Sequence, residues 1–206
     1  RQNLLRENKP DSAIYVTGNT VIDALGTTVR EDYTNPDMEW ARGSRMILLT
    51  AHRRENLGER MQQMFRAIRR VVDNVPDVKL IYPMHLNPCV RNVARKFFAG
   101  QERIRLVEPM GVLDFHNVMA RAYLIMTDSG GIQEEARSLG KPVLVLRDTT
   151  ERPEGVKAGT LRLVGTDEQP IYDTVMELLN NPQVYEAMSH AVNPYGDGKA
   201  GQRIAD

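Results

Sequence analysis

Residues 126–136 read MTDSGGIQEEA, and the order of their parts is typical of a strand that turns directly into a helix. An apolar run ends in Thr-Asp-Ser, two glycines follow, and a segment of helix-forming composition then carries two adjacent glutamates. Glycine weakens the interior of strands and helices alike, so two glycines at this junction indicate a corner that another group approaches closely. This corner is therefore the first candidate for a binding site.

Similar apolar runs, rich in Val, Ile and Leu, recur along the chain and are separated by helical patterns. Most of the runs lack strict alternation of apolar and polar residues, as expected of strands that are buried on both faces. The runs are RMILLT (45–50), VKLIYP (78–83), IRLVEP (104–109), YLIMTD (123–128), PVLVLR (142–147) and LRLVG (161–165).

Strands that alternate with helices every 20 to 30 residues or so predict βαβ units and a parallel sheet. We expect an α/β fold in which residues 42–182 form one Rossmann-like, doubly wound domain. Residues 1–41 look like a separate junction segment, with a strand, a turn and a helix in AIYVTGNTVIDAL (13–25) and a linker in TNPDMEWARG (34–43). Residues 183–206 are expected to form a C-terminal helical segment.

The composition narrows the classes of function. The 206 residues carry 27 basic and 27 acidic side chains, so no net charge favours a nucleic acid or an anionic membrane as partner. No apolar run approaches the ~20 residues that span a bilayer. Cys89 is the only cysteine, which excludes an intrachain disulfide and favours a reducing compartment such as the cytoplasm. HRREN (52–56) is not a zinc-binding HExxH, and no metal-ligand set or cofactor motif is present.

The corner at residues 128–131 has the chemistry of a phosphate cradle. Ligands of open α/β sheets bind beyond the carboxyl ends of the strands, where the first N–H groups of the next helix carry a partial positive charge. Gly130 and Gly131 remove the Cβ atoms that would keep a ligand away, and Ser129 can cap the helix or donate to a phosphate. Glu135, one turn further on, can accept from both hydroxyls of a ribose. Glu134 has a plainer interpretation, because the helix dipole alone favours an acidic residue in a first turn.

Three other predicted strand ends carry polar side chains. His52 and Arg53 follow the first run, His85 follows the second, and Arg152 lies in the loop after PVLVLR. Each has a plainer role as a surface or capping residue. Their coincidence at one edge of one sheet is what favours a shared site for an anionic ligand.

Taken together, these stretches resemble the non-hydrolysing UDP-N-acetylglucosamine 2-epimerases of bacteria. No single motif carries the resemblance, which covers nearly the whole chain. The matching segments are VTGNTVIDAL (16–25), LLTAHRREN (48–56), YPMHLNP (82–88), TDSGGIQEEA (127–136), GKPVLVLRDTTERPEGVKAGT (140–160) and NPYGDGKA (193–200).

The resemblance implies a fold of two Rossmann-like domains that face a cleft, as in GT-B glycosyltransferases, with this chain as the C-terminal half. It implies a cytoplasmic isomerase, homodimeric when complete, that serves synthesis of cell-envelope polysaccharides. The reaction inverts C2 of UDP-N-acetylglucosamine through a 2-acetamidoglucal intermediate, without metal or nicotinamide. The acidic catalytic residues of the family belong to the first domain, so we expect this chain to bind UDP without epimerising.

The resemblance also implies roles for individual residues. His52 corresponds to the active-site histidine near the diphosphate, and Glu135 to the ribose contact. The residues expected at the diphosphate cradle and its loop are Ser129, Gly130, Gly131 and Arg152. Met110 and Phe115 correspond to positions at the uracil. Arg53 and His85 correspond to contacts with a second UDP-N-acetylglucosamine, an allosteric activator.

Two alternatives remain open. One is the nucleotide-binding half of a GT-B glycosyltransferase, which would share the cradle and the ribose glutamate but transfer a sugar to an acceptor. The other is a non-catalytic module that binds sugar nucleotides. AHRREN (51–56) together with MHLNP (84–88) fits the epimerases better than the transferases.

Overall fold

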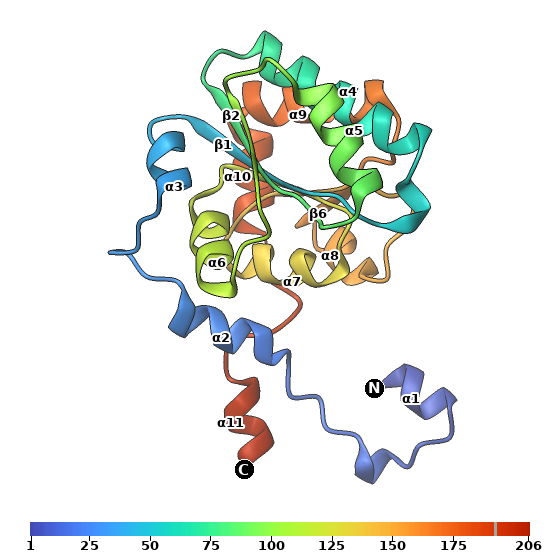
Figure 1. Ribbon diagram of the computed structural model, residues 1–206. Helices are drawn as coiled ribbons and strands as arrows, with labels where there is room; N and C mark the ends of the chain where they lie inside the picture. The colour runs from blue at the N-terminus through green and yellow to red at the C-terminus, as the bar shows by residue number, and fades with distance from the viewer. Residues whose placement is uncertain (192) are drawn as a thin grey trace.

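The computed structural model describes residues 1–191 and 193–206. Its sheet has six parallel strands within this described part, in the order β3-β2-β1-β4-β5-β6 (Figure 1). The strands are β1 (Arg45–Thr50), β2 (Val78–Pro83), β3 (Ile104–Val107), β4 (Leu124–Thr127), β5 (Val143–Val145) and β6 (Leu161–Leu163). Each lies within one of the predicted apolar runs, and the doubly wound parallel sheet is confirmed.

The order of the strands reverses between β1 and β4, which are neighbours although two strands separate them along the chain. Ile47 pairs with Leu124, and Thr50 pairs with Thr127 at the carboxyl ends. In a sheet of this kind the crevice at the reversal is the usual place for a ligand. The strands after which the sequence places polar side chains thus end around one crevice.

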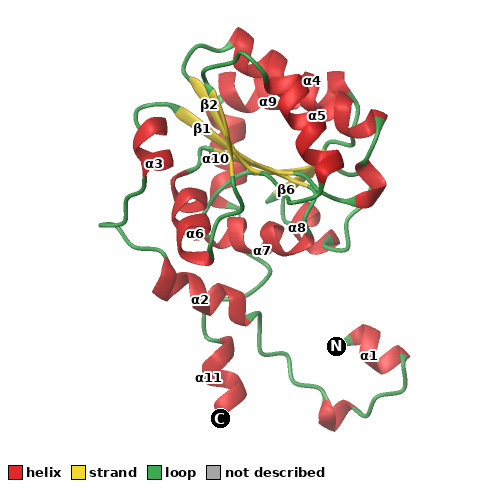
Figure 2. Ribbon diagram, viewed as in Figure 1, coloured by secondary structure: helices red, strands yellow, loops and turns green. Residues whose placement is uncertain are grey.

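Helices cover both faces of the sheet, as Figure 2 shows most plainly. One face is covered by α4 (Glu59–Asn74), α5 (Pro88–Phe98), α9 (Glu168–Asn180) and α10 (Pro182–His190). The other is covered by α2 (Thr20–Thr28), α3 (Pro36–Ala41), α6 (Val112–Arg121) and α7 (Gly130–Ser138). In α4 the apolar stripe is fully buried, with Met61, Phe65 and Val72 each 0% exposed. Burial of apolar side chains on both faces is the main favourable contribution to this fold.

Two local predictions for the first 41 residues are wrong. Residues 14–18 form no strand, and Tyr15 and Val16 are 80% and 72% exposed. Their β-forming composition has no neighbouring strand to pair with, and propensity alone does not make a strand. Residues 36–41 are the helix α3 rather than a linker, because Asn35 accepts hydrogen bonds from the first N–H groups and Pro36 follows it at the first position.

The ends of the chain extend from the side of α2 that faces away from the sheet (Figure 1). The short helices there are α1 (Gln2–Arg6) and α11 (Ala200–Ala205), and α8 (Pro153–Lys157) lies in the loop after β5. The N–H group of Gly201 donates to Asp23 of α2 over 2.8 Å, which joins α11 to the junction segment.

In α10, Tyr185 stacks on Tyr123 with ring centroids 4.2 Å apart. The domain boundaries at residues 41 and 182 remain a prediction.

Candidate functional site

The centre of the site is the point where β1 and β4 end side by side. The hydroxyl groups of Thr50 and Thr127 are hydrogen bonded over 2.6 Å, and both strands finish there. The next residue after β4, Asp128, is fully buried. One of its oxygens, Oδ2, accepts from the backbone N–H groups of His52 and Arg53 over 2.9 and 2.8 Å. Asp128 therefore fastens the His-Arg loop of β1 to the end of β4.

The predicted phosphate cradle lies at the turn between β4 and α7. Ser129 is the N-cap of α7 in an extended conformation, and its side chain makes no capping hydrogen bond within the described residues. Its N–H group donates to Thr127 Oγ1 over 2.9 Å, which fixes the turn. The helix then begins at Gly130, so its first N–H groups face outward beyond the carboxyl end of β4. Such a helix start attracts anions.

A carboxylate of the protein lies against this helix start. The side chain of Glu151 is close enough to Gly130 that a Cβ added there would come within 2.7 Å of Oε1. Arg53 donates to that oxygen over 2.8 Å, and Arg147 is hydrogen bonded to the other. Burial would raise the pKa of the Glu151 carboxyl, but backbone and arginine contacts outweigh it and lower the pKa to about 2. The group is thus anionic at neutral pH.

The two adjacent glutamates of α7 have different partners, and neither lies in the first turn of the helix, contrary to the dipole interpretation of Glu134. Glu134 is 6% exposed and accepts hydrogen bonds from Arg152 of the α8 loop and from Asn19. It therefore joins the arginine loop to the junction segment. Because it is buried among donors, its role is structural as well as electrostatic.

Glu135 faces His116 of α6, a residue that the sequence did not single out. His116 Nε2 lies 3.4 Å from Glu135 Oε2. The hydroxyl of Thr28 donates to a backbone carbonyl of α2 and lies 2.7 Å from His116 Nδ1, so that nitrogen carries the proton of the neutral ring. Burial lowers the pKa of His116, whereas burial and then the charge of Glu134 raise the pKa of Glu135. Both directions favour the uncharged form of the group.

His52 and His85 stand side by side, as their neighbouring strands require. Their rings are stacked with centroids 5.2 Å apart and an interplanar angle of 12°. His85 Nδ1 accepts from the N–H group of Asn87 over 3.1 Å. The Asn87 side chain, rather than His85, caps α5, so the alternative role of His85 as the cap of that helix is excluded.

Two hollows meet at this histidine pair. The first, of about 310 Å³, is lined by Thr50, His52, Pro83, Met84, His85, Leu86, Pro109, Met110 and Phe115. It brings the two predicted uracil-side residues next to His52. The second, of about 480 Å³, is lined by His52, Arg53, Arg54, Glu55, His85 and Asn87. Both predicted activator contacts, Arg53 and His85, lie on its wall.

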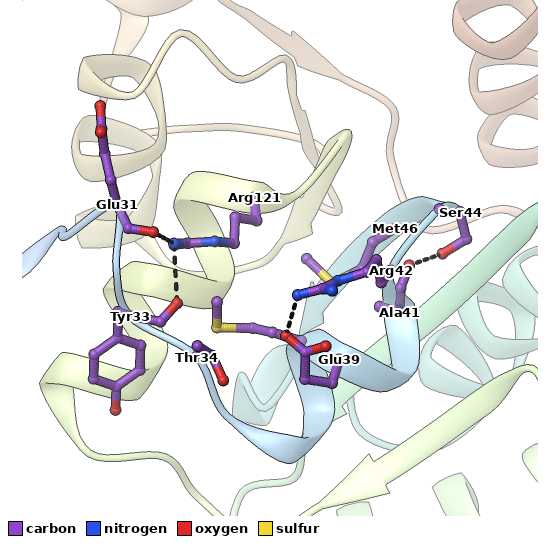
Figure 3. Close-up of a pocket in the computed structure, with 11 residues that line it drawn as sticks. Glu31, Tyr33, Thr34, Glu39, Ala41, Arg42, Ser44, Met46 and Arg121 are labelled. Carbon is purple, nitrogen blue, oxygen red and sulfur yellow. Dashed lines mark hydrogen bonds and ion pairs between the residues drawn. The ribbon is translucent and has the colours of Figure 1, made fainter.

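A further hollow, also of about 310 Å³, lies near the start of β1, away from the carboxyl ends (Figure 3). Its arginines are already engaged. Arg121 donates to the carbonyl oxygens of Glu31 and Tyr33 over 3.0 Å each, and Arg42 donates to Glu39 over 2.6 Å. The described residues also contain no cluster of three His, Cys, Asp or Glu side chains placed to hold a metal ion. The predicted site residues lie instead at the edge around Asp128.

Two contributors to this edge escaped the sequence. Asp128 stands in the TDSGG segment directly after an apolar run, and that position was the available signal for it. His116 follows Phe115 in the sequence, but its partners Thr28 and Glu135 come from other helices, so no local pattern marks it. No helix in the described part of the chain is long and apolar enough to cross a membrane.

A doubly wound parallel sheet with a helix that begins at the reversal of strand order defines the class of Rossmann-like domains. The family model described as UDP-N-acetylglucosamine 2-epimerase matches residues 1–206. The chain belongs to this family of isomerases, and its fold is that of a Rossmann-like domain of these GT-B-like enzymes.

Individual relatives agree with this assignment. The chain is 60% identical over 206 residues to the UDP-N-acetylglucosamine 2-epimerase of Bacillus subtilis, covering 100% of this chain and 54% of that protein. It is 50% identical to the enzyme of the same name from Escherichia coli K12, covering 100% of this chain and 57% of the relative. The chain thus spans about half the length of these curated relatives.

Solved structures of such enzymes also match this chain. The MnaA–UDP co-structure from S. aureus superimposes with a TM-score of 0.96 at 51% identity, over 99% of this chain and 56% of that one. The UDP-GlcNAc 2-epimerase of Neisseria meningitidis bound to UDP-GlcNAc gives a TM-score of 0.90 at 42% identity, over 99% and 57% of the two chains.

Proposed function

We propose that this chain is the UDP-binding half of an enzyme that interconverts UDP-N-acetylglucosamine and UDP-N-acetylmannosamine. The observation that carries the proposal is the cradle: the start of α7 opens at the sheet reversal, lined by Gly130 and surrounded by Arg53, Arg147 and Arg152. Relatives with this architecture have been solved with UDP and with UDP-GlcNAc. The diphosphate is assigned to the cradle, where backbone N–H groups and arginines offset its charge.

The nucleoside follows from the same placement. Glu135, one helical turn beyond the cradle, accepts from the ribose hydroxyls. Met110 and Phe115 line the first hollow beside His52, and we assign them to the uracil, with the aromatic ring as a stacking surface and Met110 contributing backbone contacts. Arg152, held by Glu134, closes over the phosphates from the α8 loop.

The proposed reaction has two balanced halves. Removal of the C2 proton and cleavage of the C1–O bond release UDP and leave a C1=C2 double bond, which is 2-acetamidoglucal. Addition of a proton to C2 from the other face and return of the UDP oxygen to C1 give the epimer. His52 serves the diphosphate that leaves and returns, by donating a hydrogen bond or a proton to it. The groups that exchange the C2 proton are assigned to the other domain of the complete enzyme.

A second molecule of UDP-N-acetylglucosamine is assigned to the hollow of about 480 Å³ beside His52, where it acts as an activator. Arg53 and His85 on its wall supply a cation and a ring nitrogen for that ligand. For the complete enzyme we also propose a homodimer that works in the cytoplasm. A glycosyltransferase half or a binding module without activity is the alternative, and a product assay separates them.

The experiment is calorimetry of the chain with UDP, combined with NMR detection of C2 proton exchange in deuterated water. We expect binding of UDP and no exchange. Gly130→Ala should weaken UDP binding about tenfold or more, equivalent to about 1.4 kcal/mol, because its Cβ fills the cradle. Gly26→Ala is the matched control, since a Cβ on this glycine of α2 meets nothing within 4 Å. Equal affinities of both variants would remove the cradle from the proposal.

A further inference from the structure

Asp128 is unusual because one of its two buried oxygens is satisfied and the other is not. Its side chain is 0% exposed. Oδ2 accepts from the N–H groups of His52 and Arg53 and from the side-chain amide of Asn56, over 2.9, 2.8 and 3.1 Å. Oδ1 is equally buried but has no hydrogen-bond partner among the described residues. Buried acceptors without a donor are rare in folded proteins, so this oxygen requires an explanation.

The ring of His52 provides a donor at the right place. Its Nδ1 lies 3.7 Å from Asp128 Oδ1, just beyond a hydrogen bond. The three donors on Oδ2 hold the carboxylate still, whereas the side chain of His52 is 38% exposed. A small rotation of the imidazole therefore closes the gap. No comparable movement is open to Asp128.

This arrangement selects one form of the imidazole. A carboxylate only accepts, so a hydrogen bond between His52 and Asp128 Oδ1 requires the proton of the ring to be on Nδ1. Nε2 is then left for the hollow that His52 and Phe115 line. Backbone and side chain of His52 thus depend on the same buried residue.

We propose that Asp128 is a positioning residue of the epimerisation: it keeps His52 in the Nδ1-protonated form and directs Nε2 at the departing diphosphate. The inference rests on the proposed role of His52. The donor is the doubly protonated ring: when its Nε2–H gives its proton to the leaving oxygen of UDP, the C1–O bond electrons go to that oxygen and the ring is left neutral, with its remaining proton on Nδ1. The neutral ring is then already in the form that Asp128 holds. On the return step the proton goes back to Nε2 as UDP rejoins C1.

The first test needs no catalysis. Long-range ¹⁵N–¹H correlation spectra distinguish the two neutral forms of a histidine, and the signals of His52 are assigned by their loss in His52→Gln. At about pH 8, where an ordinary histidine is neutral, we expect the Nδ1-protonated form in the unaltered chain. Asp128→Asn presents an amide that donates, and should shift His52 to the Nε2-protonated form. The Nε2-protonated form in the unaltered chain would overturn the proposal even if the Asn variant failed to fold.

Asn56→Ala is the matched control, because it removes one donor from Oδ2 and leaves Oδ1 in place. It should loosen the loop without changing the protonation pattern of His52. A purely structural role of Asp128 predicts that Asn56→Ala and Asp128→Asn alter the His52 signals in the same way, and that result would also contradict the inference.

The second test is steady-state kinetics in the two-domain enzyme that carries this chain. Asp128→Asn should lower kcat about 100-fold, within the range of general acid–base catalysis, with little change in KM. Combining it with His52→Ala should add almost nothing to the loss from His52→Ala alone. If His52→Ala keeps full turnover, the proposed function of His52 fails. If His52→Ala lowers turnover while Asp128→Asn retains full turnover, only the positioning role of Asp128 fails.

Discussion

Glu151 places its carboxylate against Gly130, where a Cβ on that glycine would come within 2.7 Å of Oε1. Arg53 and Arg147 hold the same carboxylate. An anion of the protein therefore occupies the place that we assign to a phosphate of UDP. The Glu151 side chain is 41% exposed, so it can leave when a stronger anion arrives.

The change Glu151→Gln should therefore tighten UDP binding. The neutral amide competes less for the helix start, and it leaves both arginines available to the ligand. We expect a gain of about fivefold, equivalent to about 1 kcal/mol, by calorimetry. The affinity for uridine, which has no phosphate, should stay the same.

Glu55→Gln is the control for this variant. Glu55 also lies beside Arg147 and Arg53, at 3.1 and 3.9 Å, but it is not the carboxylate that lies against Gly130. If both substitutions tighten UDP binding equally, the cause is the general loss of negative charge and not the occupied cradle. A weaker affinity in Glu151→Gln would mean that the carboxylate supports the site.

Glu135→Ala should weaken UDP binding more than Glu134→Ala. A hydrogen bond to a charged group contributes about 1.5 to 3 kcal/mol, which corresponds to a loss of roughly 10- to 150-fold. Glu134 acts through Arg152 and Asn19, so its loss should lower the thermal stability as well. Calorimetry with UDP and with 2′-deoxy-UDP is decisive: the deoxy ligand should be much less sensitive to Glu135→Ala. If Glu135→Ala weakens the binding of both ligands equally, Glu135 does not contact the ribose hydroxyl.

The affinity for UDP should rise with pH through the raised pKa of Glu135, which lies above the ordinary 4.5. Burial and the charge of Glu134 disfavour the ionised form in the free protein, yet the ribose hydroxyls need that form. The stability of the fold changes with pH in the opposite direction. The stabilising contribution of Glu135 is complete below the pKa that its carboxyl has in the unfolded chain, and it is lost as the pH rises through the pKa of that carboxyl in the folded chain. His116, which faces the same carboxyl, has a pKa lowered by burial and is mostly neutral near pH 7.

Glu135→Gln checks both signs. Titrations between about pH 5 and 8 should give a UDP affinity that is lower in the variant and nearly independent of pH. Thermal unfolding near pH 8 should occur at a higher temperature than in the unaltered chain, at about 2 to 4 °C for each kcal/mol gained. If the affinity of the unaltered chain for UDP does not change with pH, Glu135 is not the titrating contact.

The sheet was predictable because its information is local. A run such as RMILLT is apolar on both sides, and strand β1 needs only burial between two helical layers to form there. The start of α7 was equally visible, since Ser129, Gly130 and Gly131 act through their own backbone. Residues 14–18 failed for the converse reason, because a strand needs a partner and no local pattern supplies one.

The side-chain partnerships of the site were out of reach of local reasoning. Glu134 and Glu135 are neighbours in sequence, but the helix turns one towards Arg152 and the other towards His116. Asp128 shows its role only when the loop after β1 closes on it, 76 residues away from its partner His52. Such pairs are set by the register of strands and helices in space, which one sequence does not contain.

The last prediction concerns His85, which stacks on His52 but should serve the other ligand. Its ring lies on the wall of both hollows, and it does not cap α5. In the two-domain enzyme, His52→Ala should lower kcat by about 100-fold, the scale of a lost acid–base group. His85→Ala should instead raise the concentration of UDP-N-acetylglucosamine needed for activation and flatten a sigmoidal response, while kcat at saturation stays close to normal. Steady-state kinetics over a wide substrate range separates these outcomes. An unchanged response in His85→Ala would remove the activator site from this face and leave His85 only as the ring that stacks on His52.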